Sequence, residues 1–259
     1  MTNLSQLIGI PPAPTVSDLL SDLVSAEVSV SSATTLTSTA FGKMHLVSGS
    51  SDYTITLPAA SGNSGKIIGL RITGSALFTI DGNGSEEIDG ELTRVMWENE
   101  SAILLCNGTG WTKIAGKSIP FRSIARKDDT QSFANASEVK MTFNIIEGNY
   151  SPLYDTSNHR FILPREGVYQ ININTALTIN VSSRVLNNLY KNGTVYRNIA
   201  TGHNSDPVVG SIAGGCGSLQ IRGNIFDYYE LFINQNSGAS RDNFTFPYNQ
   251  FDITEIPTW

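Results

Sequence analysis

The chain has 259 residues, of which 15% are charged, and a formal net charge of −6. This length is enough to bury two hydrophobic cores without disulfides or metal ions to hold them together. Residues 1–120 carry 11 acids and 6 bases, and residues 121–259 carry 12 and 11, so neither half has the basic surplus that nucleic-acid binding requires.

The first 15 residues are apolar and contain Pro11, Pro12 and Pro14, which exclude a regular helix and predict an extended arm. This start lacks the positive charge and the apolar core of a signal peptide. No apolar run in the chain approaches the ~18 residues of a membrane helix. We therefore expect a protein that is made in a host cytoplasm and does not insert into a membrane.

A helix of about 13 residues is predicted next, because its apolar side chains fall on one stripe and Ser17 can cap its start. The stripe consists of Val16, Leu19, Leu20, Leu23, Val24 and Val28. Such a helix is too short to be stable alone. It packs either on its own domain or in a short coiled coil of identical chains, where Leu20 and Leu23 would face the axis. Residues 1–29 are thus an anchor arm and a trimerisation helix.

Residues 30–117 change to short strands separated by Gly and Asn. In the segment DYTITLP at 52–58, apolar residues alternate with threonines, which is the period of a strand with one buried face. The turns DGNG at 81–84, DG at 89–90 and NGTG at 107–110 contain residues that tolerate the positive φ of hairpins. We expect a β-hairpin-rich domain arranged as a meander.

Residues 118–137 are polar and weakly patterned, so we interpret them as a linker. A second set of about eight strands then fills residues 138–259, without a helical pattern between them. This spacing favours a two-sheet sandwich or jelly roll. In GVYQININTALTI at 167–179, one face is apolar and the other is rich in amides, which suits a partly buried hydrogen-bonding surface as well as a solvated one.

Residues 138–256 carry a specific motif, NYSPLYDTSNHRFILPREGVY at 149–169. It has Asn, then Tyr-Asp, then a Phe shortly before Pro, and then Gly-x-Tyr. With LYKNGT at 189–194 and RGNIFDYYELFINQ at 222–235, this stretch resembles the jelly roll shared by the complement globular head and the tumour necrosis factor superfamily. The resemblance implies a receptor-binding head with three-fold symmetry, and some of its aromatics would line the axis. The interface we expect includes Tyr169, Tyr229 and Phe251.

Residues 30–117 resemble the β-rich shaft or shoulder segments of bacteriophage fibres, on the motifs TITLP at 54–58, GK at 65–66, TIDGNGSEEIDG at 79–90 and GWTKI at 110–114. The order of arm, helix, shaft and head implies a fibre or spike of the tail or capsid. Its partners would be other virion proteins, bound through residues 1–15, and a host-surface glycan or protein. Head loops supply amides, hydroxyls and aromatic faces for such a ligand in Tyr154, Asn158, His203 and Asn204.

The sequence shows no catalytic, cofactor or metal motif. The histidines His45, His159 and His203 are widely spaced, and the start of a calcium loop at 81–85 lacks its later ligands. Carboxylates between 86 and 100 are interpreted as a solvated rim, although a glycan-cleaving fibre would need two of them. Cys106 and Cys216 lie in apolar or small-residue runs and are expected to be buried thiols; around Cys216 we expect a tightly packed strand edge or loop.

These features predict a non-enzymatic, all-β, homotrimeric virion protein that attaches to a host receptor. Three alternatives stay open: a capping or connector protein that binds only other virion proteins, a secreted lectin-like head, and a glycan-cleaving fibre.

Overall fold

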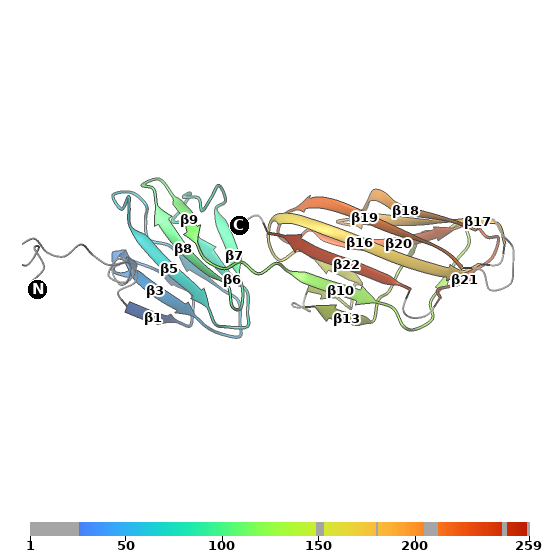
Figure 1. Ribbon diagram of the computed structural model, residues 1–259, viewed down its shortest axis with the longest axis horizontal. Coiled ribbons are helices and arrows are strands. Elements are labelled where there is room, and N and C mark those ends of the chain that lie inside the picture. The colour runs from blue at the N-terminus through green and yellow to red at the C-terminus, as the bar shows by residue number, and fades with distance from the viewer. Residues whose placement is uncertain (1–25, 149–152, 180, 205–211, 245–247, 258–259) are drawn as a thin grey trace, which may run out of the picture. The chain divides into compact units, whose positions relative to one another are not determined.

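The computed structural model describes residues 26–148, 153–179, 181–204, 212–244 and 248–257. The chain divides after Ile119 into two compact units, here called unit 1 and unit 2. The described residues form β-strands and one 3-10 turn, η1 (Ser38–Ala40), so the predicted all-β class is confirmed (Figure 1). Within the described residues, no helix is long and apolar enough to cross a membrane.

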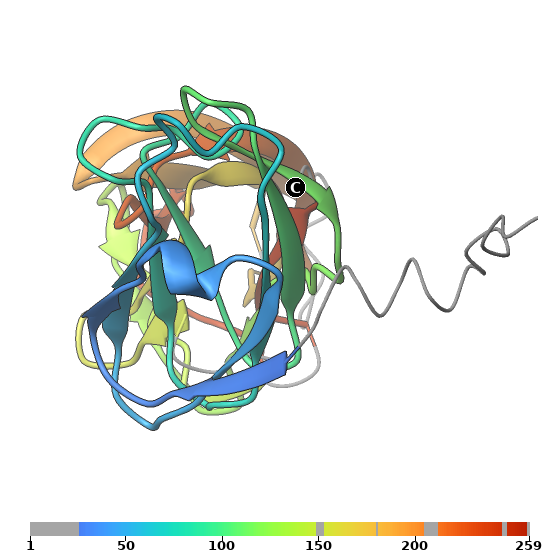
Figure 2. The ribbon, with the colours of Figure 1, turned by 90° about the vertical axis from the view of Figure 1, so that its left-hand side faces the viewer.

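Unit 1 consists of two sheets that face one another (Figure 2). The first has the strand order β1-β3-β5-β8-β9, and the second has the order β2-β4-β6-β7. The strand bounds are β1 (Ala26–Val30), β2 (Thr34–Thr35), β3 (Lys43–Val47), β4 (Tyr53–Thr56), β5 (Ile67–Ile72), β6 (Phe78–Asp81), β7 (Thr93–Met96), β8 (Ser101–Cys106) and β9 (Trp111–Ala115).

The first six strands alternate between the two sheets, and all of their pairings are parallel. Each coil of the chain therefore adds one strand to each sheet. In register, Met44 pairs with Gly69 and Tyr53 pairs with Phe78, so the β3–β5 and β4–β6 pairs share a spacing of 25 residues. Apolar side chains stack inside, as in the register-matched row Val30, Val47 and Ile72, all buried.

This arrangement corrects the expected meander of hairpins. Antiparallel pairing begins only where β7 joins β6 and β8 joins β5, and it ends with the β8–β9 hairpin. Glycine-rich turns predict a meander because they are typical of hairpins. An arch that carries the chain to the opposite sheet uses the same positive-φ residues, so the sequence cannot distinguish the two. Gly62 and Gly65, for example, have φ of +74° and +83° in the link from β4 to β5.

The end of the predicted helix is also corrected, because Glu27 and Val28 belong to strand β1 and pair with Met44 and His45. The rest of that segment, with Leu20 and Leu23, lies outside the described residues.

Unit 2 is built from β10 to β22. The bounds are β10 (Arg122–Arg126), β11 (Ser132–Phe133), β12 (Val139–Lys140), β13 (Ile145–Gly148), β14 (Tyr154–Asp155), β15 (Arg160–Ile162), β16 (Gly167–Thr178), β17 (Ser183–Lys191), β18 (Thr194–Asn204), β19 (Ile212–Gly223), β20 (Tyr228–Gln235), β21 (Arg241–Asp242) and β22 (Gln250–Ile256). The expected linker 118–137 is wrong, because it contains β10 and β11, which pair with β22 and β21. Alternation in β10 is short and interrupted by charges, so the sequence pattern there is weak.

The main strands of unit 2 form two five-membered layers, β13-β10-β22-β16-β19 and β14-β15-β20-β17-β18, with β12 also pairing β20. Apart from the consecutive pairs β14–β15 and β17–β18, neighbours within a layer are distant in sequence, because the chain crosses repeatedly from one sheet to the other. This interleaved strand order is that of a jelly roll. The prediction of a jelly-roll head is therefore confirmed by topology.

Aromatic side chains fill the space between the two layers. Phe161 contacts Tyr154 and Phe251 with ring centroids 4.9 and 4.8 Å apart. Tyr169, Tyr229 and Phe251 are each at most 1% exposed within a single chain. They stabilise the core of their own unit, so the expectation that they line an intersubunit axis is wrong. These aromatic side chains are buried because large residues from both sheets fill the core of a β-sandwich.

Glycines allow β18 and β19 to approach closely at one side of the jelly roll. A Cβ on Gly202 would lie 1.7 Å from the carbonyl oxygen of Gly214, and one on Gly217 would lie 2.2 Å from that of Ile199. The run GSIAGGCGS at 210–218 was interpreted as a tightly packed strand edge or loop. The packed strand is confirmed for the described part of that run.

Candidate binding surfaces

The outer side of the β22, β16 and β19 strands forms a polar surface that we call the amide face. In register, Asn172 lies between Asp252 and Ser218, and Gln170 lies between Thr254 and Gln220. Most of these side chains are half-buried. The amide face comprises Gln170, Asn172, Asn174, Ser218, Gln220, Gln250, Asp252 and Thr254.

Hydrogen bonds link neighbours across the amide face. Gln170 Nε2 donates to Ser218 Oγ, and Ser218 Oγ donates to Asn172 Oδ1 at 2.9 Å. Gln250 Nε2 lies 2.7 Å from both carboxylate oxygens of Asp252. Amide side chains held in this way are pre-ordered, so a partner that docks there meets a surface with little side-chain entropy left to lose.

Asp252 is the acidic member of the amide face. Burial raises the pKa of its carboxyl group, and the bond from Gln250 together with the charges of Arg122 and Arg126 only partly offsets this effect. Beside it, a shallow groove of about 510 Å³ is lined by Pro120, Arg122, Ile124, Glu147, Gly148 and Thr254. Further burial by a neighbouring surface would favour the protonated form of Asp252 still more.

The outer side of the other layer differs, and we call it the aromatic face. Its members are Lys140, Arg160, Tyr190, Tyr228, Glu230 and Phe232. The Arg160 guanidinium lies 4.4 Å from the Tyr228 ring centroid, and the Tyr190 and Phe232 rings are 4.1 Å apart. Lys140 forms an ion pair with Glu230. Planar rings beside fixed charges can bind a sugar face or a peptide side chain.

The structure places the predicted receptor residues apart. Tyr154 is 4% exposed and its hydroxyl oxygen accepts a hydrogen bond from the Phe143 amide, so it is a core residue and this prediction is wrong. Asn158 is exposed in the turn between β14 and β15, where its carbonyl accepts from Lys140 Nζ. It therefore borders the aromatic face.

His203 is exposed near the end of β18, and strands β17 and β20 lie between that strand and β15 in the sheet. Asn204 ends β18, and its side chain lies outside the description. His203 and Asn158 are thus not brought together. Tyr154 follows a loop-like segment in the sequence, which predicts an exposed position, but the Tyr154–Asp155 pair forms strand β14.

The aromatic face itself was missed. A signal was present, because Tyr228, Glu230 and Phe232 alternate along β20 and therefore share one side of the sheet. Another missed feature is the exposed turn Ile225–Phe226, in which Phe226 is 73% exposed with φ of +67°. The Asp227 carboxylate anchors this turn by accepting bonds from Asn224 and Asn192.

Acidic residues of unit 1 have a structural role as caps of backbone amides. Their carboxylates accept hydrogen bonds from backbone N–H groups. Asp52 accepts from Leu77 (2.9 Å), Glu86 from Ala60 (2.8 and 2.9 Å), Asp89 from Lys113 (3.1 Å), and Glu100 from Trp97 and Ile119 (3.2 and 2.7 Å). Arches between parallel coils leave amides without ladder partners, and a carboxylate satisfies them. These four carboxylates therefore serve the fold of unit 1.

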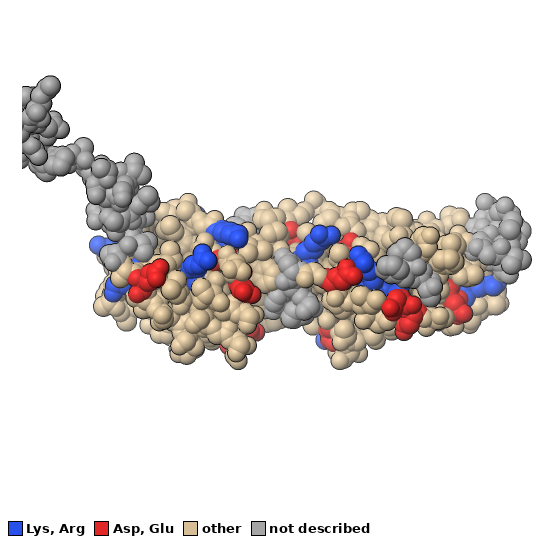
Figure 3. Space-filling view, turned by 60° about the horizontal axis from the view of Figure 1, so that its bottom comes forward, with Lys and Arg blue, Asp and Glu red and all other residues tan. Residues whose placement is uncertain are grey.

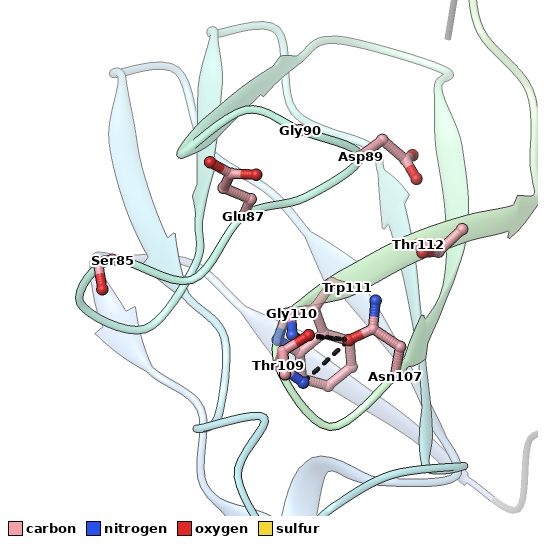
Figure 4. A pocket seen from close by; sticks show the side chains of 9 residues that line it. All are labelled: Ser85, Glu87, Asp89, Gly90, Asn107, Thr109, Gly110, Trp111 and Thr112. Atoms are coloured by element: carbon pink, nitrogen blue, oxygen red, sulfur yellow. Dashed lines mark hydrogen bonds between the residues drawn. The ribbon is translucent and has the colours of Figure 1, made fainter.

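A pocket of about 340 Å³ contains two of the acids that a glycan-cleaving site would need (Figure 4). Figure 4 shows the side chains of Glu87 and Asp89 pointing away from one another. The Asn107 Oδ1 acceptor is used by the amides of Thr109 and Gly110. The lining thus presents no converging carboxylate pair among the described residues.

Metal and thiol chemistry have little support in the described part of the chain. No group of three or more His, Cys, Asp or Glu side chains there is placed to hold a metal ion. Cys106 is buried as expected, but Cys216 is exposed on β19, with its thiol 3.3 Å from Asn174 Oδ1. The burial prediction for Cys216 is wrong because its side chain alternates onto the outer side of the sheet.

On the face drawn in Figure 3, acidic and basic side chains are interspersed.

No family model matches the chain. It is 28% identical over 163 residues to the uncharacterized protein YqcC of Bacillus subtilis (strain 168), a match that covers 58% of this chain and 43% of that protein. The chain therefore spans less than half the length of this relative.

Solved structures of tumour necrosis factor type are similar to part of the chain. Eiger TNF from S. frugiperda has 6% identity and a TM-score of 0.39, covering 54% of this chain and 94% of that one. Murine APRIL at pH 8.5 has 7% identity and a TM-score of 0.35, covering 53% and 100%. The jelly roll of unit 2 follows from its own strand order.

Proposed function

We propose that this chain is a non-catalytic virion fibre or spike protein that assembles as a homotrimer and attaches to a host-surface glycan or protein. Residues 1–15 would bind other virion proteins, and unit 2 would be the receptor-facing head. The sequence motifs shared with phage fibres and with trimeric jelly-roll heads support this proposal.

The observation that carries the proposal is the difference between the two outer faces of the jelly roll. The amide face is pre-ordered and nearly uncharged, which suits contact between copies of one chain. The aromatic face presents stacked rings and fixed ion pairs, which suits a ligand that needs orientation. A head with one face for assembly and one for recognition can repeat the same binding site around an axis, so that weak sites act together.

Assembly is tested by light scattering of the purified full chain. The expected mass is three times the 28.0 kDa of one chain. Asn174→Lys should give monomers, because it places a charge on β16, the middle strand of the amide face. The matched change Asn234→Lys, at a half-buried outward position on β20, should leave the trimer intact. A wild-type monomer would count against the proposed fibre.

Attachment is tested by competition between the purified protein and intact virus for host cells. The wild type should block adsorption. Tyr228→Ala should weaken this block about tenfold or more, since it removes a ring that contacts Arg160. Arg222→Ala, at a side chain that is 72% exposed on β19, is the control. The connector alternative would be favoured instead if two results are found together. The trimer would fail to compete with virus for host cells, and chains that lack residues 1–15 would fail to enter particles.

A further inference from the structure

A pocket of about 200 Å³ lies in unit 1 between β1 and β2, the terminal strands of its two sheets. It is lined by strand residues and by the turn that contains η1. Its lining has one cationic side chain and no carboxylate. The residues that matter for its chemistry are Thr35, Thr37, Thr39, Lys43 and His45.

His45 supplies a defined hydrogen-bond acceptor. Its side chain is 2% exposed, and Nδ1 lies 3.2 Å from the carbonyl oxygen of Gly69. A carbonyl can only accept, so Nδ1 carries the proton and Nε2 of the neutral ring carries a lone pair. Burial lowers the pKa of His45, and the nearby charge of Lys43 acts in the same direction. The ring is therefore neutral at physiological pH.

The Nε2 acceptor of His45 makes no hydrogen bond within the described residues. Nε2 is therefore an acceptor that is available to a hydroxyl or amine of a ligand in the pocket.

Lys43 and the threonines supply donors. Lys43 precedes His45 by two residues on β3, so both side chains lie on the same side of the sheet. Its ammonium forms no ion pair with a described residue. Thr37 Oγ1 and Thr39 Oγ1 are 2.9 Å apart, which uses one of their two hydroxyl protons and leaves the other for a ligand. A cation with hydroxyl donors favours a carboxylate.

We propose that this pocket binds a small hydroxy acid, such as a uronic acid residue at the end of a polysaccharide. The carboxylate lies beside Lys43 and the threonine hydroxyls, and a ligand hydroxyl donates to His45 Nε2. The volume fits one sugar ring and not an oligosaccharide. This site belongs to unit 1 and does not depend on the role proposed for the head.

The experiment is a ligand-observed saturation-transfer NMR titration of the full chain with glucuronate, glucose and acetate. Glucuronate should bind at least about tenfold more tightly than glucose, which lacks the carboxylate, or acetate, which lacks the hydroxyls. Lys43→Gln should weaken glucuronate binding about tenfold. Lys66→Gln, at an exposed lysine of the same unit outside the pocket, should not change it.

Thr39→Val provides a second variant that leaves the buried histidine and the lysine in place. It should weaken glucuronate binding severalfold while far-ultraviolet circular dichroism stays unchanged. The proposal is overturned if glucose binds as well as glucuronate. It is equally overturned if glucuronate fails to bind, or if its affinity survives Lys43→Gln, since any binding would then lie elsewhere, including in the head.

Discussion

Arg165 and Glu255 form a two-pronged ion pair at the edge of the jelly-roll core, with Nε–Oε1 and Nη2–Oε2 distances of 2.7 Å. The same carboxylate accepts from the Phe121 amide at 3.1 Å, and the guanidinium lies 4.5 Å from the Phe121 ring centroid. The pair thus fastens the start of β10 and the end of β22 to the turn before β16.

Glu255→Gln should destabilise unit 2 by about 3 kcal/mol, because it leaves a largely buried guanidinium without its counter-charge. Urea unfolding followed by circular dichroism measures the change. Glu166→Gln is the control, since Glu166 pairs with Arg222, whose side chain is 72% exposed. If both variants lose a similar amount of unfolding free energy, the burial of the Arg165–Glu255 pair does not add to its contribution to stability.

Asp227 predicts a loss of stability at low pH. Burial opposes its ionisation, but bonds from Lys191 and Asn192 outweigh this and hold the pKa of its carboxyl group below the ordinary 3.8. A lowered acid pKa stabilises the fold above pH 3.8, and this stabilisation disappears as pH falls through the lower folded-state value. Thermal unfolding of the wild type should therefore show a drop in Tm over that range. In Asp227→Asn, Tm should be lower at pH 7 and the drop should be smaller.

The close approach of β18 and β19 predicts that Gly202 cannot be replaced. Gly202→Ala would place a methyl group 1.7 Å from the Gly214 carbonyl oxygen, so the strands must separate. Overpacking of this kind costs about 1–3 kcal/mol or more. Thr201→Ala, at the exposed neighbouring position, should change the free energy of unfolding by less than about 0.5 kcal/mol. Equal stability of the two variants would contradict the glycine contact.

The amino-terminal arm is predicted to act in attachment to the particle. Deleting residues 1–15 removes an apolar segment that precedes the first described strand by ten residues. The truncated chain should keep its thermal stability but fail to enter virions, as measured by quantitative immunoblotting of purified particles. Normal incorporation would remove the case for an anchor.

The strands of both units were largely predictable from local alternation, as in Val168–Thr178, where Tyr169 and Ile171 are buried and Gln170 and Asn172 are not. The pairing partners were not. Parallel and antiparallel neighbours bury the same alternating residues, so the pattern in Tyr53–Thr56 could not reveal that its partner is the parallel strand Phe78–Asp81.

Site residues were harder to predict than strands, because exposure depends on contacts that are distant in sequence. Tyr154 and Asn158 lie four residues apart, yet one is in the core and the other faces outward. His45 gave no local signal at all. Its Nε2 atom is identified as the acceptor only because Nδ1 contacts the Gly69 carbonyl, 24 residues further along the chain.

The common spacing of 25 residues in the β3–β5 and β4–β6 pairs also makes the length of unit 1 adjustable. Residues 48–72 contain one strand for each sheet, β4 and β5. Duplicating this segment would insert a β4 copy before β6 and a β5 copy before β8, with every inward side chain still inward. The stack would grow by one strand spacing, roughly 4.8 Å. A domain built in this way can change its length in fixed small increments by gene duplication, without redesign of either end.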